Sequence, residues 1–202
     1  LKGMKSLKEI TIRQCPNLRS LSGIESLPRL EFLDIDSAVI NSLTDLKDLK
    51  NLDRVHIECD KLLNLKGLEE APNINELNLT SKGLEDISNI KSLTKLKDLD
   101  LSECSSIESL SGLEKLSLLE SLKVTDCSKL NSLDGVPNSD VYVLNKRFGS
   151  GVEVNLRGCS SLKDITALKG ASKIDWLEID GCNSIRETEG LDKIKIDLLR
   201  CS

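Results

Sequence analysis

Residues 96–104 read LKDLDLSEC, and this pattern of apolar residues recurs along nearly the whole chain. Further stretches match its first, fourth and sixth positions, and neighbouring copies are 22 or 23 residues apart outside the irregular stretch between 119 and 151. They begin at Leu7, Leu30, Leu52, Ile74, Leu119 and Ile174, and at Gly151, where glycine replaces the first apolar residue. A half-repeat, Ile196 to Leu198, closes the chain. The sequence is therefore built from about nine copies of one unit.

Two structural elements are predicted for each unit. Apolar residues at the fourth and sixth positions alternate with polar ones, which is typical of a short strand that buries one face. Later apolar residues recur about every third position, which favours a 3₁₀ or irregular return path. A single unit cannot bury its apolar edge alone, so the units must stack. We expect an α/β solenoid: one curved domain over residues 1–202, with parallel strands on the concave face and 3₁₀, short helical or irregular segments on the convex side.

The composition agrees with a core in which every unit repeats the same side-chain packing. The 202 residues include 38 leucines, whereas aromatic residues make up only 2% of the chain. No apolar run is longer than four residues, which excludes a membrane span. A formal net charge of -5 argues against a nucleic-acid partner.

These units resemble the leucine-rich repeat family over nearly the whole chain. The 22-residue units at 30–51 and 74–95 are similar to internalins and to the repeat-type regulator of protein phosphatase 1. The units that carry a cysteine are similar to repeats of plant intracellular immune receptors and of some trypanosomatid proteins. The resemblance implies a solenoid that binds other proteins. It also implies that the slot held by these cysteines faces inward and bonds to the neighbouring turn.

Two regions depart from the repeat. Residues 137–151 interrupt it, either as a hairpin that joins 140–143 to 152–156 or as one severely shortened unit. The chain also begins within a unit and shows no polar cap at either end. We therefore expect it to be an excerpt of a longer protein.

The cysteines are predicted to be structural thiols. Six of the seven lie three residues after the last apolar strand position, and their spacing matches neither a zinc site nor a CxxC motif. Free buried thiols favour a reducing, intracellular compartment. Cys59 lies one residue off this slot and is expected at the surface. The six are Cys15, Cys104, Cys127, Cys159, Cys182 and Cys201.

The residues needed for catalysis are nearly absent. His56 is the only histidine, and its position between two inward residues places it on the outer side of a strand. Nothing in the sequence orients it as a base for Cys59. No phosphate-binding glycine loop, metalloprotease motif or EF-hand is present. We expect neither enzymatic activity nor a metal or cofactor.

The polar positions of the strands form the candidate binding surface. Across eight units they hold 16 acidic and six basic side chains, which predicts an acidic concave face for a basic protein partner. Two aromatic residues share one repeat position on it and are candidate anchors. The candidate contact residues are Phe32, Asp34, Asp36, Arg54, His56, Asp98, Asp100, Lys123, Trp176, Glu178 and Asp180.

Three functions fit this surface. The first is a non-enzymatic scaffold for protein–protein interaction. The second is a ligand-sensing segment of a larger immune, signalling or ubiquitin-pathway protein. The third is a surface adhesin of the internalin type.

Overall fold

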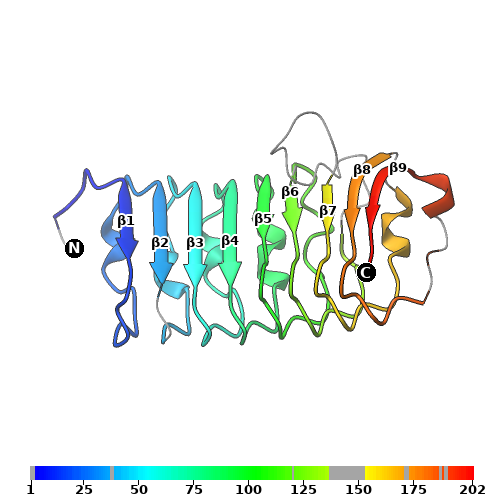
Figure 1. Cartoon of the computed structure of the whole chain (residues 1–202). Helices are drawn as coiled ribbons and strands as arrows, with labels where there is room; N and C mark the ends of the chain where they lie inside the picture. Colours follow the sequence, from blue (N-terminus) through cyan, green and yellow to red (C-terminus); the bar gives the residue numbers. More distant parts are fainter. Residues whose placement is uncertain are drawn as a thin grey trace.

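Nine parallel strands form one open sheet whose spatial order follows the chain, β1 to β9 (Figure 1). The computed structural model describes residues 3–36, 39–119, 121–136, 153–170, 173–186, 188 and 191–202. The strands are β1 (Glu9–Ile12), β2 (Phe32–Asp36), β3 (Arg54–Glu58), β4 (Glu76–Thr80), β5 (Asp98–Asp100), β6 (Ser121–Lys123), β7 (Glu153–Asn155), β8 (Lys173–Glu178) and β9 (Lys195–Arg200). The predicted solenoid is confirmed.

Short 3₁₀ helices lie behind the sheet and return the chain to the start of the next strand (Figure 1). The apolar residues spaced about three apart fall in and around them and point into the core, as Ile24, Leu46 and Ile90 do. These helices are η1 (Ile24–Ser26), η2 (Thr44–Leu46), η3 (Leu68–Glu70), η4 (Ser88–Ser92), η5 (Thr166–Gly170) and η6 (Leu191–Lys193).

Equivalent repeat positions stack in register. Ile10, Leu33, Val55, Leu77 and Leu99 are successive ladder partners at the fourth position, from β1 to β5. From β2 onward these side chains are buried, together with the first-position row that includes Leu30, Leu52 and Leu96. The core of the described residues consists of aliphatic side chains and cysteines, with no aromatic ring. Each row therefore accepts one medium-sized side chain per coil.

The register of the last strand differs from the expected half-repeat. The pattern Ile196-Asp197-Leu198 suggests the fourth and sixth positions, but Ile196 pairs with Ile174, at the first position. The ladder thus keeps the 22-residue spacing, and Leu199 rather than Leu198 pairs with Leu177. Cys201 consequently falls at the strand position of Ile179, not in the cysteine slot, and it is exposed.

The predicted interruption at 137–151 lies outside the described residues. On either side of it, β6 pairs directly with β7 through Lys123 and Asn155.

Five buried thiols line the turns that follow the strands. Each donates a hydrogen bond to a backbone carbonyl of the preceding coil. The Sγ–O distances are 2.7 Å from Cys59 to Ile40, 3.5 Å from Cys104 to Leu79, 3.0 Å from Cys127 to Leu101, 3.5 Å from Cys159 to Val124 and 3.0 Å from Cys182 to Leu156. All are free cysteines. They combine apolar packing with a weak hydrogen bond.

Cys59 is buried, so its expected surface position is wrong. Coils of 23 residues place one left-handed residue before the slot, such as Glu103 with φ 61° before Cys104. The coil that starts at Leu52 has 22 residues and lacks this extra residue, so Cys59 takes the same inward place. Ser81 does so in the next coil, where its Oγ donates to the Cys59 carbonyl at 2.6 Å. Cys15, in the first coil of the described stack, is exposed.

Gly67 precedes η3 at φ 110°, and a Cβ there would overlap the Leu43 carbonyl group of the neighbouring coil. Gly23 has the same role before η1 at φ 99°, with no atom near the Cβ position. We predict that Gly23→Ala costs about 1 kcal/mol of unfolding free energy from backbone strain alone. Gly67→Ala should cost about 3 kcal/mol, because the coils must also move apart. Urea unfolding of the two variants measures the difference, and equal losses would contradict the close packing of the coils.

We predict that only Cys15 and Cys201 react rapidly with a thiol reagent in the folded chain, since the other five are buried. Replacing both by serine should leave no fast-reacting thiol at neutral pH. Unfolding that double variant in urea should release five reactive groups. A fast thiol that remains in the folded double variant, at Cys59 above all, would contradict the inward slot.

Burial raises the pKa of the Cys104 and Cys159 thiols to about 12 and that of Cys182 to about 11. Because these pKa values are higher in the folded chain, the neutral thiols stabilise it fully below the unfolded value of about 8.5, and this contribution is lost as pH rises toward 11–12. Each thiol should remove up to about 1.4 kcal/mol per pH unit above that value. We predict a shallower alkaline decline of the unfolding free energy in Cys104→Ala than in Cys15→Ala. Equal slopes in urea titrations from pH 8 to 10.5 would refute this.

Candidate functional site

Polar side chains stand in columns on the open face of the sheet, the face away from the leucine core. Because the strands are in register, one repeat position forms one column across neighbouring strands. The first column contains Glu9, Phe32, Arg54, Glu76, Asp98, Ser121, Trp176 and Leu198. The second contains Thr11, Asp34, His56, Asn78, Asp100, Lys123, Asn155, Glu178 and Arg200.

Asp34 lies in the second column, where the sequence predicts an exposed acidic group, but it is only 5% exposed. Its Oδ2 accepts hydrogen bonds from Arg13 Nη2 at 2.5 Å and Nε at 3.1 Å, and these contacts raise the pKa of the Arg13 guanidinium. Its Oδ1 lies 3.7 Å from His56 Nδ1. Asp34 is therefore neutralised by its neighbours and organises the strand ends rather than offering a free negative charge.

Two other predicted acidic residues are also matched across strands. Asp100 accepts Lys123 Nζ at 3.0 Å and the Ser102 hydroxyl at 2.5 Å. Glu178, 8% exposed, accepts Asn155 Nδ2 at 3.1 Å and lies 3.7 Å from Arg200 Nη1. The middle and end of the second column therefore carry little net charge.

The acidic character is concentrated where β2 to β5 end. Asp36, Glu58 and Glu103 surround a hollow of about 110 Å³, together with the ion pair of Asp60 and Lys82, whose atoms are 3.8 Å apart. Asp36 and Glu58 are ladder partners at the ends of β2 and β3. We call these four carboxylates and Lys82 the acidic rim. Of its residues only Asp36 is among the predicted contacts. The signal for the others is that carboxylates follow the final apolar strand position in neighbouring units.

Each of the two predicted aromatic anchors is stacked against an arginine from the following coil. The Arg54 guanidinium carbon lies 4.7 Å from the Phe32 ring centre, and that of Arg200 lies 5.5 Å from the Trp176 ring. Such stacking holds the ring in place and leaves a cation beside it. Trp176 Nε1 is buried and has no hydrogen-bond partner among the described residues, and the same holds for Asp180 Oδ1. Both rings are half-buried, at the two ends of the face.

A polar hollow of about 400 Å³ lies on the face between these two ends. It spans β4 to β6, where Asp98 is exposed and Asp100 is bound to Lys123. Its lining combines acceptors and donors on neighbouring strands, namely Glu76, Asn78, Asp98, Asp100, Ser121 and Lys123. This composition suits a polar protein surface better than an apolar small molecule.

The only His–Cys pair considered from the sequence is not formed. Cys59 faces inward and bonds to the Ile40 carbonyl, whereas His56 lies on the opposite, open face beside Asp34. Within the described ranges, no three His, Cys, Asp or Glu side chains are placed to hold a metal ion. No helix in the described part of the chain is long and apolar enough to cross a membrane.

The fold is shared with solved leucine-rich-repeat structures. An internalin (inlF) of Listeria monocytogenes has a TM-score of 0.67 at 17% identity, over 98% of this chain and 57% of its own length. The leucine-rich repeat domain of the type III effector XopL has a TM-score of 0.70 at 17% identity, over 96% of this chain and 68% of that domain. No family model matches the sequence, and no curated protein is similar to it. The chain has the leucine-rich-repeat fold.

Proposed function

We propose that this solenoid is a non-enzymatic scaffold that binds a protein partner through its open face, with a basic segment of the partner on the acidic rim. The observation that carries the proposal is the distribution of charge. Carboxylates in the middle of the face are paired with arginine or lysine, whereas Asp36, Glu58 and Glu103 have no cation of the described residues within ion-pair distance. These three offer negative charge to a partner.

The acidic rim and the two aromatic anchors have different roles in the proposed contact. A rim of like charge steers a basic partner and accelerates its association, while each exposed pair adds only about 0.2–1 kcal/mol. The rings of Phe32 and Trp176 contribute apolar area that the stacked arginines already hold in position. The charge of the rim therefore sets the rate of association, and the two rings set how long the partner stays bound.

The compartment is a second part of the proposal. The five buried cysteines are free thiols with raised pKa values, a state that fits a reducing, intracellular environment. This favours a scaffold or a sensing segment over a surface adhesin. The acidic surface favours a protein over nucleic acid as the partner.

We predict that Asp36→Lys with Glu58→Lys abolishes capture of the partner from extracts of the source cells by the immobilised chain. The expected loss is at least tenfold, because two steering charges become repulsive. The matched control is Glu70→Lys with Glu85→Lys, which makes the same charge change at exposed positions away from the rim. Thermal melting should be unchanged in both. Capture is measured by quantifying the bound proteins after mass-spectrometric identification.

Equal capture by the rim variant and the control variant would refute the proposed rim contact. Trp176→Ala separates the two parts of the surface, since it removes a ring without altering the net charge. It should speed dissociation of the captured partner and leave the salt dependence of binding unchanged.

A further inference from the structure

The junction between β6 and β7 differs from the other strand pairings of the sheet. β5 and β6 have three residues each and are paired at all three, from Asp98–Ser121 to Asp100–Lys123. β7 and β8 are also paired at every residue of β7. Between β6 and β7, Lys123 with Asn155 is the only ladder pair among the described residues, at the end of both strands. The described ladder is therefore shorter at this junction than at the two neighbouring ones.

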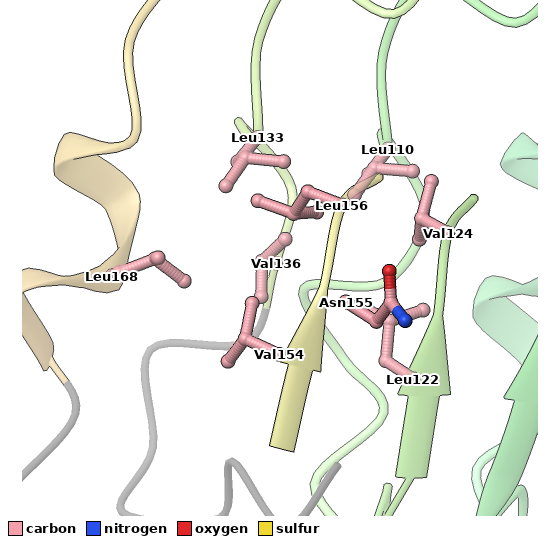
Figure 2. Close-up of a pocket in the computed structure, with 9 residues that line it drawn as sticks. All are labelled: Leu110, Leu122, Val124, Leu133, Val136, Val154, Asn155, Leu156 and Leu168. Carbon is pink, nitrogen blue, oxygen red and sulfur yellow. The ribbon is translucent and has the colours of Figure 1, made fainter. Parts of the chain in front are cut away.

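A small cavity lies in the core at this junction. Aliphatic side chains from β6, β7 and the return segments converge on it (Figure 2). Its volume is about 10 Å³, close to the lower limit for one water molecule, and its apolar lining offers little to hold a water. The lining residues are Leu110, Leu122, Val124, Leu133, Val136, Val154, Asn155, Leu156 and Leu168.

The fourth-position row of leucines is also less completely buried at this junction. Leu122 of β6 is 7% exposed, whereas its ladder neighbours Leu99 and Leu77 are 1% and 0% exposed. A core with a gap loses dispersion contacts on both walls.

The sequence supplies the cause of the gap. The units that begin at Leu119 and Gly151 are 32 residues apart, whereas the other neighbouring units are 22 or 23 apart. The second of these units has glycine where the others place leucine or isoleucine. Beyond the strand ends, Asp126 N donates to Arg157 O at 2.7 Å and also joins the two coils.

We propose that this junction is a weak seam that divides the solenoid into two cooperative blocks, β1–β6 and β7–β9, and that the β7–β9 block unfolds first. The stability of a repeat protein is close to a sum of repeat terms and nearest-neighbour interface terms, so one weak interface separates two folding units. Three of the nine described strands belong to the β7–β9 block. Leu198 and Leu199 of β9 are 50% and 54% exposed.

The single tryptophan makes the proposal directly testable in the intact chain. Trp176 lies on β8, so its fluorescence reports the β7–β9 block, whereas far-UV circular dichroism reports all nine strands. In equilibrium urea unfolding, the fluorescence transition should have the lower midpoint, and the dichroism should change in two steps. Coincident transitions would overturn the proposal. Hydrogen exchange supplies a second measurement, with faster exchange expected in peptides from 153–202 than in peptides from 39–119.

A matched pair of variants tests whether the blocks are independent. Val154 of β7 and Val55 of β3 are buried at the same repeat position. Val154→Ala should lower the fluorescence midpoint and widen the interval between the two transitions. Val55→Ala should lower the second dichroism step and leave the fluorescence midpoint unchanged. If Val55→Ala moves the fluorescence midpoint as far as Val154→Ala does, the solenoid unfolds as one unit and the seam is refuted.

Discussion

Stacking in register is the constraint on which the rest of this structure depends. Each coil must bring its first, fourth and sixth residues to the same place as the coil before it, because the strands pair residue by residue. A row then takes one medium-sized aliphatic side chain per coil, which explains the abundance of leucine and the absence of aromatic rings from the described core.

The same constraint explains how coils of two lengths coexist. A 23-residue coil adds one left-handed residue before the inward slot, as Glu103 does at φ 61°, and a 22-residue coil omits it. The slot itself stays in place, and Cys59, Ser81 and Cys104 all occupy it. The change in length is absorbed in the turn, so the strand ladder continues undisturbed on both sides.

The strand order and most of the register could be predicted from the sequence, because eight units repeat the same apolar positions. Features that depend on one coil's relation to the next could not. Two alignments of β9 with the repeat give the same alternation of apolar and polar residues. Only the pairing of Ile196 with Ile174 decides between them. Cys59 looks misplaced until the missing turn residue is seen in three dimensions. The neutralisation of Asp34 by Arg13 joins residues of two coils, and counting charges within each unit does not reveal it.

These cross-strand pairs change what the acidic surface can do. Neighbouring strands lie about 4.8 Å apart, so a cation at one repeat position can reach a carboxylate at the same or an adjacent position of the next coil. Lys123 does so for Asp100, and Arg200 does so for Glu178. Negative charge without such a match remains where β2 and β3 end, at Asp36 and Glu58. The rim and Phe32 lie on the β1–β6 side of the proposed seam and Trp176 lies on the other side, so the seam separates the two aromatic anchors of the face.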